Sequence, residues 1–538
     1  MSLLRRTTAA LRLFARLLPV VTALAALPAP SLAHGALRRS VPASGAHLPT
    51  APSELRLTFN ESVELAIARL RLLGPDSVEV ALAPLVLPPD SATVLVARIT
   101  GPLRAGTYVV AWQVAGADGH PVRGTYSFVI APGAQGLAPA ATSAGPTAPG
   151  QAPPPASHHR ATSLPEGLWF DAESPLYAMV RWLTYLGLLG VVGAVAFRFA
   201  VLPLVRRQGT APALAILAPA AGRAARLGLT AAAVLALAGV LRLYAQSYAL
   251  HGAEGALEPA LVGTMLSRTV WGWGWLLQAV GTALVGAGFA RARRAPRRVR
   301  PPREEAGEME EVRETGEAEA PFTAASGAPA VAVAQAPVAS VAATAPEPAR
   351  EPSRTGWALA AMGAVALAFT PALSGHAAST PRVTALAILA DGVHVLSAGG
   401  WIGGLLLVLA AGIPVALGLV REERGPAVAA LVNAFSPTAL LFAGALTVTG
   451  VFAAWVHLGS VPALWETAYG RTLLLKLAVL SAVFGTGAYN FLRVKPALDG
   501  EPGVLRLRRS AMVEIAVGVL VLAVTAVLVA TATPADAA

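Results

Sequence analysis

The sequence predicts an all-β domain followed by an all-α membrane domain with eight transmembrane helices. Hydrophobic residues make up 55% of the 538 residues and charged residues only 13%, which is too apolar for a soluble globular protein of this length. Beyond residue 175, eight apolar runs approach or exceed the ~18 residues that a membrane-spanning helix requires. Between residues 34 and 131, short runs instead alternate apolar and polar side chains, a pattern typical of β-strands.

The first 33 residues have the features of a secretory signal peptide. Two arginines precede an apolar stretch at 11–27, and Ser31 and Ala33 supply the small residues of a cleavage site. Cleavage after Ala33 would make His34 the first residue of the mature protein. The alternative is an uncleaved membrane anchor, because the apolar stretch is long.

Residues 34–131 are predicted to form the β-domain. The alternating runs are 55–59, 93–97, 108–112 and 126–129, and the turns between them include Gly74-Pro75-Asp76 and Ala117-Asp118-Gly119. Short strands at this spacing predict a sandwich or barrel of about 100 residues. Residues 132–174 are rich in Ala, Pro, Gly, Thr and Ser, and we expect them to form a flexible linker.

The membrane domain is predicted to cover residues 175–531. Its eight spans lie at about 178–203, 226–248, 270–290, 356–374, 384–419, 433–456, 472–492 and 511–531. The fifth span is longer than about 30 Å of hydrocarbon needs, so we expect part of it to project outside or to break near Gly399-Gly400. Residues 291–355 begin with arginines, turn acidic and become rich in Ala, Pro and Val, which predicts a disordered loop.

Basic residues near the span ends concentrate in alternate connections. The connections rich in basic residues carry Arg206, Arg207, Arg223, Arg226, the arginines of 291–300, Arg421, Arg424, Arg493, Lys495, Arg506, Arg508 and Arg509. The alternate connections carry only Arg268, Arg382 and Arg471. By the positive-inside rule, the connections rich in basic residues, including 291–355, face the cytoplasm. The β-domain and the connections 249–269, 375–382 and 457–471 then face outside, in agreement with the signal peptide.

The composition restricts how a metal could be held. The chain has no cysteine, so disulfides and thiolate sites are excluded, and a metal would need nitrogen or oxygen ligands or the six methionines. The nine histidines are His34, His47, His120, His158, His159, His251, His376, His394 and His457. None falls in a predicted cytoplasmic connection, which favours metal handling on the outer side. The alternative is chance, because the outward-facing segments hold more than half of the polar sequence.

The β-domain contains a candidate copper(II) site. Asp118 and His120 are two residues apart, and on an extended strand this spacing places both side chains on one face. His34, as a free N-terminus, could chelate copper(II) through its α-amine and its ring together. Amine, imidazole and carboxylate ligands would form the tetragonal nitrogen and oxygen site that copper(II) prefers. The alternative is a turn aspartate beside a surface histidine.

Two groups of motifs mark the ends of this domain. The first comprises His34-Gly35-Ala36-Leu37, residues 40–46 and residues 55–61, and the second comprises residues 108–112, Ala117-Asp118-Gly119-His120-Pro121-Val122 and residues 124–128. With these motifs the segment resembles the CopC copper-binding domain. The resemblance implies a Greek-key β-sandwich whose copper(II) ligands match His34, Asp118 and His120. Some CopC proteins also have a methionine-rich copper(I) site, but residues 34–130 contain no methionine, so we expect none here.

The membrane domain contains a second candidate site. Asp391 and His394 are three residues apart and share one face of a helix, and an ionisable pair inside an apolar span is by default functional. We expect a metal-transfer site formed by His376, Asp391 and His394, with His251 and His457 as additional candidates. The alternative is that Asp391 merely pairs with Lys476 or Arg382.

Further motifs relate the membrane domain to a known family. They are Ser374-Gly375-His376-Ala377, Asp391-Gly392-Val393-His394, Trp401-Ile402-Gly403-Gly404-Leu405, Tyr469-Gly470-Arg471 with Lys476, and residues 509–514. With them, about 175–531 is similar to the CopD family. The chain therefore resembles a CopC–CopD fusion.

Several other charged and aromatic residues fall within the spans. Arg198 is expected to reach the inner headgroups, and Glu514 to do the same with Arg509. Arg242 receives no assigned chemistry. The tryptophans at 271, 273 and 275 are expected to form an interfacial aromatic belt.

The sequence thus predicts copper binding outside a bacterial inner membrane and copper import across it, in copper homeostasis or resistance. The expected partners are copper ions, the lipid bilayer and periplasmic copper donors. Nucleic acid is not expected despite the net charge of +11, because the arginines lie at helix ends. No enzymatic activity is expected. The alternatives are a membrane redox protein, which as a haem protein would need paired histidines on facing helices, and a copper-delivery scaffold for oxidase assembly without transport.

Overall fold

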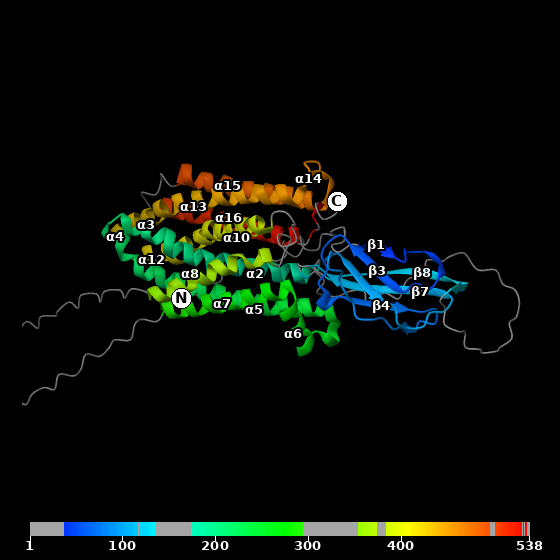
Figure 1. Cartoon of the computed structure of the whole chain (residues 1–538). Helices are drawn as coiled ribbons and strands as arrows, with labels where there is room; N and C mark the ends of the chain where they lie inside the picture. Colours follow the sequence, from blue (N-terminus) through cyan, green and yellow to red (C-terminus); the bar gives the residue numbers. More distant parts are fainter. Residues whose placement is uncertain are drawn as a thin grey trace, which may run out of the picture.

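The structure is a computed structural model with a β-domain at one end of a helical membrane domain (Figure 1). It describes residues 37–116, 119, 121–135, 174–293, 353–373, 384–494, 501–529, 531 and 533–534. The predicted signal peptide lies outside the described residues, as do most of the linker at 132–174 and most of the loop at 291–355. These three predictions stay predictions.

The β-domain consists of two sheets. One contains β1 (Leu37–Val41), β3 (Glu54–Phe59) and β6 (Val94–Arg98); the other contains β2 (His47–Thr50), β8 (Pro121–Gln135), β7 (Gly106–Ala115), β4 (Arg69–Leu73) and β5 (Glu79–Val80), in this spatial order. A short helical turn, η1 (Leu65–Ile67), precedes β4.

The two sheets share one hydrophobic core. Leu55 and Leu57 of β3 alternate inward from the first sheet, and Phe128 of β8 faces them from the second, all three with no exposed surface. Phe59 meets the edge of Trp112 across the sheets at a ring-centroid distance of 5.2 Å. The predicted all-β domain is confirmed as a sandwich.

The membrane domain follows as a bundle of long helices. These are α2 (Pro175–Ala196), continued by η2 (Phe197–Val201) and α3 (Leu202–Arg207); α4 (Ala211–Ala215) and α5 (Leu217–Gly255); α6 (Pro259–Arg268) and α7 (Val270–Arg293); α8 (Arg354–Ala368) and α9 (Thr370–Leu373); α10 (Thr384–Ala398), η4 (Gly399–Gly403), α11 (Gly404–Leu407), η5 (Val408–Gly412) and α12 (Ile413–Ala416); α13 (Arg421–Leu458); α14 (Ala463–Glu466), α15 (Ala468–Tyr489) and η6 (Asn490–Val494); and α16 (Glu501–Leu528). Within the described residues, 8 helices are long and apolar enough to cross a membrane, which confirms the predicted number.

The fifth span continues through the glycines at which a break was expected. Ala385–Ala416 is one helix that widens into π-helical turns at η4 and η5. Gly403 of η4 lies directly against Gly193 of α2, and a methyl group on either glycine would overlap the backbone of the other helix. Close backbone contact through small residues is how membrane helices associate without a hydrophobic driving force between them.

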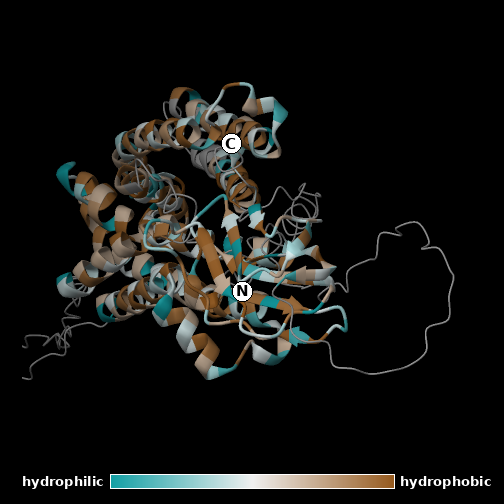
Figure 2. Ribbon diagram, turned by 45° about the vertical axis from the view of Figure 1, so that its right-hand side comes forward, coloured by the Kyte–Doolittle hydropathy of each residue, from teal (hydrophilic) through white to brown (hydrophobic). Residues whose placement is uncertain are grey.

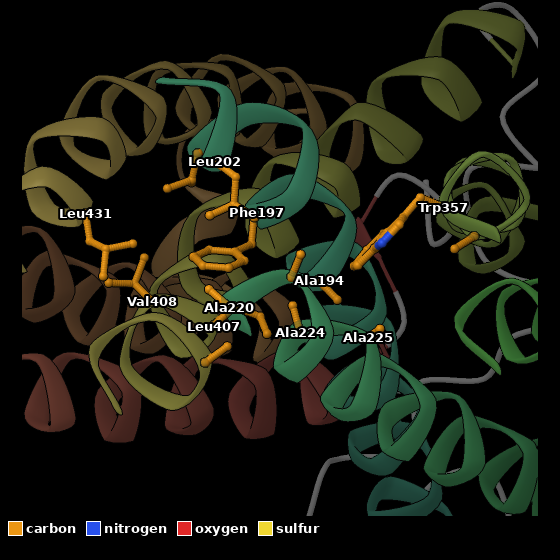
Figure 3. Close-up of a cluster of buried hydrophobic side chains, with 14 of the residues drawn as sticks. Ala194, Phe197, Leu202, Ala220, Ala224, Ala225, Trp357, Leu407, Val408 and Leu431 are labelled. Carbon is orange, nitrogen blue, oxygen red and sulfur yellow. The ribbon is translucent and has the colours of Figure 1, made fainter. Parts of the chain in front are cut away.

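The same close packing builds the centre of the bundle (Figure 3). Phe197 is fully buried between the alanine-rich side of α5 and the side chains of Leu407 and Val408. Hydrophobic residues predominate along the helices in Figure 2, and some of them face outward, such as Leu441 of α13, which is 71% exposed. This outward apolar surface is suited to contact with lipid.

The β-domain lies at the end of the bundle where α5 ends, α6 runs and α7 begins (Figure 1). The ends of α3 and α4 lie at the opposite end. This arrangement is compatible with the topology that the arginines predict, in which 249–269 faces the same side as the β-domain.

A labelling experiment tests this topology. We expect a membrane-impermeant thiol reagent applied to spheroplasts to label Glu254→Cys and to spare Ala320→Cys, because the basic connections orient the chain with 291–355 inside. The chain has no native cysteine, so there is no background. Disrupted membranes should label at both positions, and the opposite pattern in intact spheroplasts would invert the topology.

Candidate functional site

The turn between β7 and β8 contains the predicted copper ligands Asp118 and His120. Both lie outside the described residues, as does His34, so the predicted copper(II) site stays a prediction. Gly119, between the two ligands in sequence, is described, and its φ of 79° is a left-handed conformation that favours glycine. Ala115 pairs with Pro121 across the hairpin, so Gly116 and Gly119 lie in the connection between β7 and β8.

This turn rests on the membrane domain. Gln246 of α5 donates a hydrogen bond from Nε2 to the carbonyl oxygen of Gly119. The Trp271 ring at the start of α7 lies so close to Gly119 that a Cβ there would overlap it. Glycine is therefore needed at 119 both for the backbone conformation and for the contact with Trp271.

The end of α5 supplies further contacts to the same hairpin. Gly252 adopts φ 76° and ψ −178° and interrupts the helix, which leaves carbonyl groups of the preceding turn without helical partners. Gln113 of β7 donates to the carbonyl of Leu250 at 3.0 Å, and Arg123 of β8 donates to the carbonyl of Ala249. Each such bond contributes on the order of 1 kcal/mol, and leaving a buried carbonyl unpaired costs more.

An apolar cluster completes the contact between the two domains. Ile67 and Ala115 of the β-domain pack with Leu250, Met265 and Trp271 of the membrane domain. Trp271 is only 2% exposed, so the predicted interfacial aromatic belt is wrong for this residue. Its indole is buried between the domains because the β-domain covers it, which a hydropathy pattern does not reveal.

Glu64, just before η1, caps the first turn of α7. Its Oε1 accepts a hydrogen bond from the backbone N–H of Val270 at 3.0 Å. Burial at the interface raises the pKa of Glu64 above the ordinary value of 4.5, and the hydrogen bond from Val270 opposes part of that rise.

The second candidate site lies within the bundle, on α10. Asp391 and His394 share one face of this helix, and Nδ1 of His394 lies 3.0 Å from Oγ1 of Thr449 on α13. The Thr449 hydroxyl donates to the carbonyl of Ala445 at 2.8 Å, so it accepts the Nδ1 hydrogen of His394. A neutral imidazole arranged in this way leaves Nε2 as an unprotonated ligand for a metal.

Lys476 of α15 is a cation that acts on this pair. It interacts electrostatically with Asp391 and with His394. Within the described part of the chain, however, no ion pair within 4.0 Å joins Lys476 to Asp391, since the ion pairs found there are in the β-domain. The alternative that Asp391 merely pairs with Lys476 is therefore not supported by a direct contact; Arg382 lies outside the described residues.

Of the other predicted ligands, His251 and His457 do not join this pair. His376 lies outside the described residues. His251 lies beside the interface with the β-domain, with Nδ1 3.3 Å from Oγ of Ser247, and His457 lies at the end of α13 with its ring 6.3 Å from that of Tyr469. Across the described residues, no three His, Cys, Asp or Glu side chains converge on a possible metal position.

Two polar residues within the spans, Arg242 and Glu514, have defined partners. Arg242 of α5 donates to Oε1 of Gln278 at 2.9 Å, with its guanidinium 5.3 Å from the centre of the Trp271 ring. Glu514 was expected to reach the inner headgroups, but only 4% of it is exposed, and Asn490 donates a hydrogen bond to it at 3.0 Å. The expectation for Glu514 is wrong because its partners lie on neighbouring helices.

Together, the fold and these sites define a polytopic membrane protein with a β-sandwich docked on one end of its helical bundle. Family models match three segments: the CopC domain at residues 37–131, the Copper resistance protein D-like, N-terminal domain at residues 171–301, and Copper resistance protein D at residues 429–528. The chain belongs to the CopC–CopD family of copper resistance and copper transport proteins.

Individual relatives cover either the whole chain or its β-domain. Copper transport protein CutJ of Bacillus subtilis is 24% identical over 517 residues, which is 95% of this chain and 76% of that protein. Copper resistance protein C of Escherichia coli is 31% identical over 106 residues, which is 19% of this chain and 83% of that protein. The crystal structure of CopC from Methylosinus trichosporium OB3b is 28% identical, covers 18% of this chain and 95% of that chain, and has a TM-score of 0.18.

The docking contact at Glu64 predicts a pH dependence. A buried carboxylate is costly when charged, so the docked form binds the Glu64 proton more tightly than a separated β-domain does. Docking should therefore be favoured below about pH 4.5 and weaken as the pH rises through the raised pKa of Glu64. Spin labels on Val78→Cys and Leu257→Cys, both at exposed positions, would report the docked fraction as an inter-label distance.

Glu64→Gln is the matched control, because its amide oxygen still accepts from Val270 but the side chain has no charge to titrate. This variant should lose the pH dependence. A docked fraction that increases with pH in the unsubstituted protein would contradict the prediction.

Proposed function

We propose that this protein captures copper(II) outside a bacterial inner membrane and passes it into the membrane domain for import, in copper homeostasis or resistance. The observation that carries the proposal is the docking of the β7–β8 turn on α5 and α7. This turn contains the candidate ligands Asp118 and His120, and Gly119 between them contacts Gln246 and Trp271.

Capture would use His34, Asp118 and His120. An N-terminal amine, imidazoles and a carboxylate suit copper(II) rather than copper(I), which prefers sulfur ligands. The family membership supports this ligand set, and the left-handed Gly119 supports a tight turn between the two ligands.

Transfer would be helped by the docked geometry. A flexible tether alone gives an effective concentration on the order of millimolar, whereas docking holds the turn against one defined surface. From this surface, polar groups continue into the bundle: Arg242 lies one helical turn from Gln246, and Tyr185 interacts electrostatically with both Arg242 and Asp391.

Asp391 and His394 would receive the ion. The hydrogen bond to Thr449 orients the His394 ring and leaves Nε2 available, which is the arrangement found where a second group fixes a metal-binding histidine. The Asp391 carboxylate would offset part of the charge that copper(II) brings into a medium of low dielectric constant. His376 would add a further ligand.

The transfer step can be tested with histidine variants. In proteoliposomes of known orientation, His394→Ala should reduce radiocopper uptake by roughly tenfold or more, since one ligand and its orienting bond are lost together. Copper bound by the β-domain should be unchanged. His47→Ala, at an exposed position of β2, is the control for loss of a histidine as such. Uptake of His394→Ala at the level of the unsubstituted protein would exclude the transfer site as placed here.

The capture step has a separate test. The β-domain alone, residues 34–135, contains its own hydrophobic core and should bind one copper(II) tightly when His34 is its first residue. One additional residue before His34 would block chelation by the amine and the ring together, so the affinity should fall. Equal affinity of the two forms in a competition titration would remove the N-terminal histidine from the site.

A further inference from the structure

Four exposed apolar residues lie where the β-domain meets the start of α7. Leu65 and Ala66 belong to η1, and Val270 and Trp273 belong to α7; Leu65 is 39% exposed, Val270 44% and Trp273 63%, and Ala66 is exposed as well. Glu64 brings the two pairs together, because its Oε1 accepts the N–H of Val270 at 3.0 Å and Leu65 follows it directly in the chain. We call these four residues the junction patch.

The short turn η1 has one side in the protein interior and another side outside. Ile67 is 7% exposed and packs with Leu250 and Trp271 of the membrane domain. A 3₁₀-helix has about three residues per turn, so Leu65, two residues before Ile67, points in a different direction. The buried side fixes η1 against the bundle, and the other side presents Leu65 and Ala66 outward. A single exposed leucine is ordinary on a soluble protein, but this one adjoins an apolar helix face.

The exposed side of α7 that begins at the junction patch continues along the helix. Val270 and Trp273 are three residues apart and share one side of α7, and Val280, about two helical turns after Trp273, is 57% exposed on the same side. Val280 lies near the middle of α7, which is one of the helices long and apolar enough to cross a membrane. Because Val280 is exposed at that depth, this side of α7 contacts lipid.

The length of α7 places the junction patch at a surface of the bilayer. The 24 residues of α7 span about 36 Å, slightly more than the roughly 30 Å of hydrocarbon, so its two ends lie near the two membrane surfaces. Arg291 and Arg293 lie in the last turn and Trp273 in the first, as is common where helices leave a membrane. On α13, Trp455 is likewise exposed, at 72%, near the C-terminal end of the helix. Leu65, beside the first turn of α7, therefore lies at the level of the lipid headgroups.

We propose that the β-domain binds the lipid bilayer directly, with Leu65 and Ala66 inserted among the lipid headgroups beside the first turn of α7. The exposed Arg268, two residues before Val270, is suited to bind lipid phosphates at the same level. The β-domain is then held by two surfaces, the end of the bundle and the membrane. Separating it from the bundle also requires that Leu65 leave the lipid for water. This contact involves no metal, so it does not depend on the proposed capture or import of copper.

Spin labels test the position of Leu65 relative to the bilayer. Leu65→Cys and Val78→Cys would be labelled separately in the full-length chain, which has no native cysteine, and reconstituted in liposomes of phosphatidylcholine and phosphatidylglycerol. Val78 is 61% exposed in the turn after β4 and is the matched control. It lies at the end of β4 away from the bundle, because Arg69 at the other end pairs with Gln113, whose side chain bonds to α5.

Power-saturation electron paramagnetic resonance compares collisions of each label with oxygen, which concentrates in lipid, and with a water-soluble nickel chelate. The label at position 65 should collide mainly with oxygen, and the label at position 78 mainly with the chelate. A label at position 65 that collides mainly with the chelate faces water, which overturns the proposal. A label at position 65 that is shielded from both reagents is covered by protein, and this result overturns it too.

A charged substitution tests whether the lipid contact contributes to docking. In the same liposomes, Leu65→Asp should lower the ratio of docked to separated β-domain by roughly tenfold, because a carboxylate is costly where it meets apolar lipid. The distance between labels on Val78→Cys and Leu257→Cys reports this ratio. Leu65→Met keeps an apolar side chain and should dock like the unsubstituted protein, and so should Val86→Asp, at a 52% exposed position elsewhere on the β-domain. An unchanged ratio in Leu65→Asp overturns the proposal.

Discussion

Gly252 interrupts the hydrogen-bond ladder of α5 at the end of the bundle that meets the β-domain, and the placement of the β-domain depends on that interruption. Backbone carbonyls at a helix end must find other donors. Gln113 and Arg123 provide them from two adjacent strands, so the hairpin is held at two points. Its turn is then fixed against Gln246 and Trp271, which is the contact from which the proposed transfer of copper begins.

The low dielectric constant of a membrane imposes a second constraint on the polar residues of the spans. Three of them have a local hydrogen-bond partner: Thr449 for His394, Gln278 for Arg242, and Asn490 for Glu514. These partners are neutral, so each orients the polar group by a hydrogen bond without forming an ion pair with it. A direct ion pair between Asp391 and an arginine or lysine would instead have occupied the carboxylate that the proposed metal site needs.

Close helix contacts make these pairings possible. Where Gly193 meets Gly403, α2 and the fifth span approach until their backbones touch, and the helix widens into a π-helical turn at that point. The turn includes Trp401, whose indole then reaches Glu514 on another helix. Small residues and an irregular turn thus determine which side chains meet inside the bundle.

The sequence by itself determined the two-part architecture, the eight spans, the family and the shared face of Asp391 and His394. These properties depend on hydropathy and on spacing along one element, which are local. Only the tertiary structure decided which residues meet across elements. Thr449 is 55 residues from His394, and Gly119 is 127 residues from Gln246. The burial of Trp271 and Glu514 likewise follows from what covers them. Apolar helices of similar hydropathy can be arranged in many ways, and the contacts of a few glycines, carbonyls and amides select one.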